Sequence, residues 1–196
     1  MSRRNYNLYF FSTLLIALGF FLLPKTTLAA SLYFSPASGS YAVGKTFSAN
    51  VYVSSADQAM NAAGGVISFP EDKLEITSLT KSGSIIGLWV QDPSFSNGAG
   101  TVNFEGIVLN PGFSGSGGKI MTINFKVKSA GSAGLNFSSG SILANDGAGT
   151  NILDGMGSAS YQLSGGTPSP TTPTEPTTAT TPTAAAGVFS VRHCTR

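Results

Sequence analysis

Between residues 31 and 164, apolar and polar side chains alternate along many short segments. In KIMTINFKVK (119–128), every second residue from Met121 to Val127 is apolar, and the residues between them are polar or charged. TFSANVYV (46–53) follows the same pattern. A period of two is typical of a β-strand with one buried face. Looser versions of the pattern occur in GVISF (65–69), GTVNFEGIVL (100–109), GLNFSSGSIL (134–143) and SASYQL (158–163).

Gly- and Asn-rich turns separate these segments, and none of them has a helical period. About nine short strands without helices predict an all-β sandwich, because sheets with one wet face must pair their apolar faces. The polar stretch in FPEDKLEI (69–76) fits this fold. Pro70 cannot donate to a strand ladder, so residues 71–73 are expected to form a solvated turn. Leu74 and Ile76 are then expected to start the next strand facing inward.

The two ends of the chain differ from this central part. Residues 1–30 combine a basic start with an apolar run of 16 residues and small residues at the end, as in a secretory signal peptide. The run is shorter than the roughly 20 residues that span a bilayer, so a cleaved signal is predicted and an uncleaved anchor is the alternative. Residues 165–186 predict a disordered Pro/Thr-rich linker. Residues 187–196 are an unassigned tail, compatible with a truncated end.

Charge and cysteine content exclude several classes of function. Without Arg3, Arg4 and Lys25 of the predicted signal, 8 basic residues stand against 9 acidic ones, which leaves no basic surface for nucleic acid. The only His and the only Cys are His193 and Cys194. The predicted domain therefore has no disulfide framework, no zinc site and no His- or Cys-based nucleophile. No spacing pairs two carboxylates as a glycosidase requires, so the sequence predicts no enzyme.

Four stretches in this order resemble a cohesin-type domain: SPASGSYAVGKTFSANVYVSS, MNAAGGVISFPEDKLEITSLTKSGS, GTVNFEGIVLNPGFSGSGGKIMTINFKV and ILANDGAGTNIL. The resemblance covers roughly residues 31–163 and rests on order and spacing. It implies a nine-stranded jelly-roll β-sandwich over residues 31–164 that binds rather than catalyses. Cohesins typically capture dockerin modules and so assemble polysaccharide-degrading enzymes. The fold is also similar to that of carbohydrate-binding modules, and cohesin-like domains occur in surface proteins outside cellulosomes.

The chain departs from the family at one place. Dockerin-binding cohesins often carry polar side chains at the start of the strand that ends at a Leu-Glu corner. The matching stretch here is Ala62-Ala63-Gly64-Gly65, and only Asn61 before it is polar. The resemblance therefore leaves the protein partner open between a dockerin-like module and another protein.

One sheet face is the candidate partner-binding surface. In IIGLWVQD (85–92), alternation places Leu88 and Val90 toward the core and Trp89 outward, where a Trp suits a protein or sugar partner. The alternative is that Trp89 belongs to the core or shields an end of the sandwich. Other strands direct further residues outward, and in the family the equivalent strands share the sheet that receives the partner. The predicted face comprises Val66, Ser68, Trp89, Gln91, Asn103, Glu105 and Ile107, against the alternative of an ordinary solvated surface.

Calcium is the only cofactor that the sequence suggests, through Asn145, Asp146 and Asp154. Oxygen ligands of this kind suit Ca²⁺, but Asn-Asp-Gly is also typical of a tight turn, and the turn is the favoured interpretation. The sequence thus predicts a secreted or cell-surface recognition module. Direct polysaccharide binding is an alternative and would require Trp89, Tyr52 and Tyr33 to lie coplanar on one surface. A purely structural or adhesin role is the other.

Overall fold

The computed structural model describes residues 29–165, which form β-strands and turns and contain no helix. The all-β prediction is confirmed, and this part of the chain offers no helix that could cross a bilayer. Of the predicted signal (1–30), residues 1–28 lie outside the described residues, whereas Ala30 is the buried first residue of β1, one residue before the predicted start of the domain. The predicted linker (165–186) from residue 166 on, and the predicted tail, also lie outside the described residues. The strands are β1 (Ala30–Ser35), β2 (Ser38–Ala42), β3 (Thr46–Ser68), β4 (Leu74–Thr80), β5 (Leu88–Ser96), β6 (Thr101–Ile107), β7 (Phe113–Val127), β8 (Gly131–Ala144), β9 (Leu153–Met156) and β10 (Ala159–Ser164).

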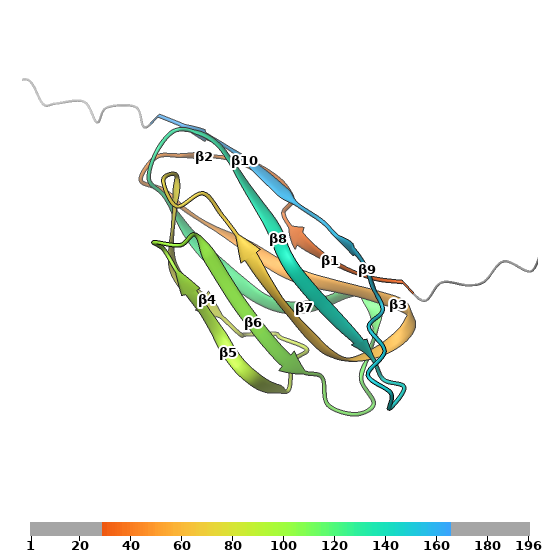
Figure 1. Cartoon of the computed structure of the whole chain (residues 1–196). Helices are drawn as coiled ribbons and strands as arrows, with labels where there is room; N and C mark the ends of the chain where they lie inside the picture. Colours follow the sequence, from red (N-terminus) through yellow and green to blue (C-terminus); the bar gives the residue numbers. More distant parts are fainter. Residues whose placement is uncertain (1–28, 166–196) are drawn as a thin grey trace, which may run out of the picture. The chain divides into compact units, whose positions relative to one another are not determined.

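The strands form two layers that share β3 (Figure 1). The N-terminal half of β3 pairs with β1 and β7, and β9 and β4 extend this layer on either side. The C-terminal half of β3 pairs with β6 and β8, and β5 pairs with β6. The start of β8 pairs with β10, which in turn pairs with β2. The inner faces of both layers enclose one apolar core, which makes the fold a β-sandwich.

The described residues contain ten strands, whereas the sequence pattern predicts nine. Two segments that alternate separately in the sequence, 46–53 and 65–69, belong to the single 23-residue strand β3. Strands β2 and β9 have only five and four residues, and segments this short show no clear alternation. The count therefore differs where the sequence pattern is interrupted or too short to recognise.

Alternation does identify the core-facing side chains of the two longest regular segments. Every second residue from Phe47 to Val53, and from Met121 to Val127, is buried. These two segments pair with each other in the layer that contains β1 and β7, with Phe47 opposite Phe125. Their stacked rings, 5.4 Å apart between centroids, form part of the aromatic end of the core.

Tyr161 of β10 completes this aromatic end. Its side chain is fully buried, its ring lies 4.9 Å from that of Phe47, and its hydroxyl donates a hydrogen bond of 2.7 Å to the carbonyl oxygen of Pro36. Burial, with a smaller contribution from the neighbouring Tyr41, raises the pKa of Tyr161 to about 12. Its only polar group is therefore neutral and paired, as a buried hydroxyl needs to be.

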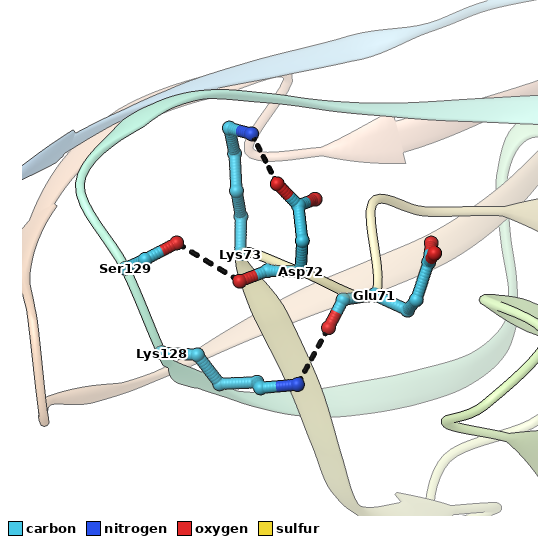
Figure 2. A network of polar contacts seen from close by, with 5 residues as sticks. All are labelled: Glu71, Asp72, Lys73, Lys128 and Ser129. Carbon is cyan, nitrogen blue, oxygen red and sulfur yellow. Dashed lines mark hydrogen bonds and ion pairs between the residues drawn. The ribbon is translucent and has the colours of Figure 1, made fainter.

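The polar stretch at residues 71–73 is a turn, as the sequence predicts. Figure 2 shows how the residues just before strand β8 hold it: the Lys128 ammonium donates to the Glu71 carbonyl at 2.7 Å, and the Ser129 hydroxyl to the Asp72 carbonyl at 2.9 Å. The Lys73 ammonium lies 2.6 Å from the Asp72 carboxylate. This hydrogen bond holds the pKa of Asp72 below its usual value.

Leu74 and Ile76, which follow the turn at the start of β4, are both buried, as predicted. Truncating Leu74 to Ala is expected to lower the free energy of unfolding by about 2–5 kcal/mol, because it removes a completely buried side chain and leaves a cavity. Truncating the adjacent Glu75 is expected to change it by less than about 0.5 kcal/mol. Urea unfolding followed by circular dichroism measures both values. Equal effects of the two variants would contradict the inward orientation of Leu74.

Tyr161 predicts a loss of stability at alkaline pH. The folded-state pKa of about 12 lies above the ordinary value of 10.0, so the neutral hydroxyl contributes stability that is complete below pH 10 and is lost as the pH rises toward 12. The Tyr161→Phe variant should therefore show a flatter decline of unfolding free energy over this range than the unchanged protein. If the unfolding free energy of the two proteins declined equally between pH 10 and pH 12, ionisation of Tyr161 would not be the cause of the lost stability.

Candidate functional site

The layer β8–β3–β6–β5 has an outer face whose composition follows from the strand register. Its central row contains Gly64 of β3, which lies opposite Glu105 of β6 on one side and Ser141 of β8 on the other; Gln91 of β5 completes it beyond Glu105. A second row, here called the polar row, consists of Ser94, Asn103, Val66 and Ser139. On the other side of the central row, the apolar row consists of Leu88, Ile107, Ala62 and Leu143.

A shallow groove of about 320 Å³ lies over Gly64. A Cβ atom at Gly64 would lie 3.4 Å from Cγ of Glu105 and 3.6 Å from Oγ of Ser141. A side chain here would therefore fill the space between these two residues, and its absence opens the floor of the groove. The next residue, Gly65, has the opposite role, because its Cβ would point inward to within 3.2 Å of the Phe104 ring.

The polar groups around the groove are not used by the domain itself. Within residues 29–165, no side-chain hydrogen bond involves the five polar residues that line it: Gln91, Asn103, Glu105, Ser139 and Ser141. The outer face of the other layer contrasts with this. There, Ser48 donates to Asn124 and Thr122 donates to Asn50, both at 2.7 Å. Donors and acceptors at the groove are thus available to a ligand.

Most of the exposed large apolar side chains lie on or just after the two strands at one side of this layer, and Leu88 and Ile107 of the apolar row are among them. The described residues expose six large apolar side chains, and five of them lie on β5, on β6 or just after β6: Leu88, Val90, Phe95, Ile107 and Leu109. Leu88 is 55% exposed and Ile107 is 37% exposed. Leu109 lies against Gly87, next to Leu88. A group of exposed apolar residues bordered by polar ones is typical of a surface that binds another molecule.

Six of the seven residues predicted for the partner-binding face lie on this outer face. Gln91, Glu105 and Ile107 are exposed, and Val66, Ser68 and Asn103 are half-buried. Strands β3 and β6 pair without interruption from residue 62 to residue 68, so alternation gives the orientation of their side chains correctly. A role of these residues in binding stays a prediction.

Trp89 does not share this face. Its side chain is half-buried against the core and lies 3.3 Å from the Cβ position of the buried Gly106, whereas Leu88 and Val90, which alternation places toward the core, are exposed. The register explains the difference: Trp89 pairs with Gly106 and Gln91 with Glu105, so Val90 is an extra residue on β5. A β-bulge of this kind shifts the alternation by one residue. The outward orientation predicted for Trp89 is therefore wrong, and the alternative, in which it belongs to the core or shields an end of the sandwich, fits its half-buried position.

Comparison with known proteins identifies the family. The cohesin domain family matches residues 34–158, well over half of the chain. The chain belongs to the cohesin family. No curated protein matches the sequence.

Solved cohesin structures share the fold of this cohesin domain. A cohesin module of a Clostridium perfringens family 33 glycoside hydrolase has 14% identity and a TM-score of 0.56, over 72% of this chain and 100% of that chain. A non-cellulosomal cohesin from Archaeoglobus fulgidus has 18% identity and a TM-score of 0.54, over 69% and 91%. A type I cohesin–dockerin complex from Clostridium thermocellum has 11% identity and a TM-score of 0.55, over 71% and 98%. At these identities the likeness concerns the fold.

The calcium candidates of this cohesin domain take part in a turn. The Asp146 carboxylate accepts hydrogen bonds from the backbone N–H groups of Ala148 and Gly149, and the Asn145 amide donates to the Pro111 carbonyl. Hydrogen bonds, first from the Thr150 side chain, lower the pKa of Asp146. Asp154 lies on β9, and residues 29–165 contain no group of three or more His, Cys, Asp or Glu side chains that could hold a metal. The turn interpretation fits these contacts.

The three aromatic residues of the polysaccharide alternative do not form one platform. Tyr33 and Tyr52 stack on each other on β1 and β3, with ring centroids 5.4 Å apart, and the Tyr33 hydroxyl donates to the Ser116 carbonyl. These strand segments belong to the layer without β5, whereas Trp89 lies on β5 and faces the core. The coplanar arrangement that this alternative requires is therefore absent from these three residues.

The position of Trp89 predicts a structural role for it. We expect Trp89→Ala to lower the free energy of unfolding by about 2 kcal/mol or more, because the substitution removes a large side chain packed on the core. The neighbouring Leu88→Ala should change it by less than about 0.5 kcal/mol, since Leu88 is exposed. Urea unfolding followed by far-ultraviolet circular dichroism tests this without the Trp signal. If Trp89→Ala left the free energy of unfolding unchanged, the result would contradict the packing of Trp89 on the core and favour the outward orientation.

Proposed function

We propose that this cohesin domain is a non-catalytic extracellular binding module that recognises a dockerin-like or other protein partner through the outer face of β8–β3–β6–β5. The observation that carries the proposal is the combination on one face of an apolar row, in which Leu88 and Ile107 are exposed, with a groove whose polar side chains make no hydrogen bond within the described residues. Apolar contacts supply burial, and unpaired polar groups supply directional contacts, as in protein–protein interfaces of moderate size.

The chemistry of the groove supports a binding role. Glu105 is the only carboxylate that lines it, whereas glycoside hydrolysis uses two carboxyl groups about 5–10 Å apart. The only His and Cys of the chain are at positions 193 and 194, outside the domain. The residues that line the groove therefore include polar donors and acceptors but neither a nucleophile with its base nor an acid–base pair.

Two further observations support a protein as the partner and an extracellular location. Solved relatives include cohesins in complex with dockerins, and the described rows of the outer face contain no aromatic platform for sugar rings. The secretory pattern of residues 1–30 directs the domain out of the cytoplasm. The Pro/Thr-rich segment after residue 164 would act as a semi-rigid spacer between the cohesin domain and the next part of the protein or the cell surface.

Binding to purified dockerin modules tests the proposal, with the Clostridium thermocellum and Acetivibrio cellulolyticus dockerins of the solved complexes in the panel. We expect saturable binding to at least one module and no retention on insoluble cellulose, chitin or xylan. Ile107→Asp should weaken binding at least about tenfold, because it places an unpaired charge in the apolar row. Ile107 is partly exposed, so this variant should fold.

Thr46→Asp on the opposite layer is the control, since Thr46 is exposed at the start of β3 and its side chain makes no hydrogen bond within the described residues. Retention on a polysaccharide without any protein would favour the sugar-binding alternative. Binding that Ile107→Asp leaves unchanged would place the partner on another surface. A purely structural role predicts no saturable partner.

A further inference from the structure

We propose that Asn97, in the turn between β5 and β6, is a site of spontaneous deamidation, and that the folded domain restrains this reaction by holding the Asn97 carboxamide against the edge of β4. The modified residue would no longer hold that edge. This modification would be independent of the partner-binding role, since it takes place at the open side of the sandwich and requires no partner.

Asn97 takes the place of a neighbouring strand at the edge of β4. The Ile76 N–H donates to Oδ1 of Asn97 at 2.8 Å, and Nδ2 of Asn97 donates to the Ile76 carbonyl oxygen at 3.0 Å. Strand β4 pairs with β7 alone among the described strands, so these two backbone groups face away from the sheet. Ile76 is buried, and buried backbone groups without partners are unfavourable. One side chain thus satisfies both groups.

The Asn97–Ile76 contact also joins the two layers at the open side of the sandwich, where their edge strands β4 and β5 meet (Figure 1). Further along this side, Lys81, just after β4, pairs with Asp92 of β5, and their side chains are 46% and 74% exposed. An ion pair this exposed contributes little to stability. Asn97 is half-buried, so its contact with Ile76 is the better shielded of the two.

The residue after Asn97 makes its carboxamide reactive. In deamidation, the backbone nitrogen of the next residue loses its proton and attacks Cγ of the asparagine, and ammonia leaves. Water then opens the resulting succinimide to an aspartyl or an isoaspartyl residue. A glycine in the next position favours the attack, because it has no Cβ to obstruct it. Asn97–Gly98 is the only Asn-Gly pair in the chain, so Asn97 is the asparagine that the sequence makes most reactive.

The turn leaves the attacking nitrogen free and holds the group that it attacks. The Gly98 N–H makes no hydrogen bond within residues 29–165, and a Cβ on Gly98 would meet no atom within 4 Å. The Asn97 carboxamide, in contrast, is fixed by both bonds with Ile76. Ring closure requires this group to move onto its own backbone, so the reaction has to wait for the two bonds to open.

Deamidation would remove the donor from the Asn97–Ile76 contact. An ionised carboxylate still accepts from the Ile76 N–H, but it has no donor for the Ile76 carbonyl and places a negative charge beside it. An isoaspartyl residue also lengthens the backbone by one carbon atom. Either product leaves the edge of β4 partly unpaired, and an unpaired strand edge can pair with another chain.

Peptide mapping by mass spectrometry tests the site and its restraint. The purified protein is incubated at mildly alkaline pH, folded or unfolded in urea, and the conversion of each asparagine is followed. In urea, Asn97 should react fastest, and folding should slow it at least about tenfold. Gly98→Ala is the matched control: its new Cβ has open space in the folded turn but should slow the reaction in urea. Another asparagine reacting fastest in urea would overturn the site, and equal rates in the two states would overturn the restraint.

Asn97→Asp tests the contact through its response to pH. At neutral pH the carboxylate cannot donate to Ile76, so the ratio of unfolded to folded protein should rise at least about tenfold over that of the unchanged protein. A protonated carboxyl group has the shape of the carboxamide and one O–H donor, so it can form both bonds. The folded state therefore raises the pKa of this carboxyl group, and the loss of stability should be absent at low pH and appear as the pH rises through that pKa.

Asn97→Ala is the control for this response, because it loses both bonds at every pH and its loss of stability should stay constant. Urea unfolding at several pH values measures both variants against the unchanged protein. Hydrogen exchange followed by NMR locates the effect, since the Ile76 amide should exchange at least about tenfold faster in Asn97→Ala. A loss of stability in Asn97→Asp that does not change with pH, or an Ile76 amide equally protected in Asn97→Ala, would overturn the role of the contact.

Discussion

Strand β3 is the constraint on which the rest of the sandwich depends. Its 23 residues run through both layers, so one continuous segment supplies buried side chains to each of them, including Val51 in the first half and Ile67 in the second. The corner between the halves is held by the buried Ser55, whose hydroxyl donates to the Gln58 carbonyl at 2.6 Å. Once the inward residues of the second half are fixed, its outward residues are fixed as well. The groove at Gly64 is thus a consequence of how the core is filled.

The fold could be predicted because its cause is local. Alternation over 46–53 and 119–128 specifies strands with one apolar face, and two such faces need each other. The turn at residues 71–73 was predictable for the same reason, since Pro70 ends one strand and Leu74 begins another with a buried side chain. What the pattern lacked was continuity: nothing in residues 54–64 indicates that the strand continues through a corner.

The site was predictable only where pairing is regular. Glu105 and Ile107 lie on a central strand with partners on both sides, which holds the period of two. Trp89 lies on the edge strand β5, which pairs with β6 alone, so an extra residue at Val90 disturbs only one ladder. Alternation cannot show such a bulge. The sequence pattern could not predict the role of Gly64 either, because Gly64 opens the groove by having no side chain.

The outer faces of the two layers differ in how many of their polar side chains lack a hydrogen-bond partner. This difference favours selective binding at the face of β8–β3–β6–β5. On one layer, Ser48, Asn50, Thr122 and Asn124 form side-chain hydrogen bonds in pairs, and such groups gain little from a partner. On the other, one uncompensated carboxylate stands beside an apolar row. A partner that covered this row without offering a cation or a hydrogen-bond donor would have to desolvate Glu105 at a cost, so this residue would disfavour such partners. Selectivity at this face would therefore come from the cost of covering one charge as much as from the apolar area that is buried.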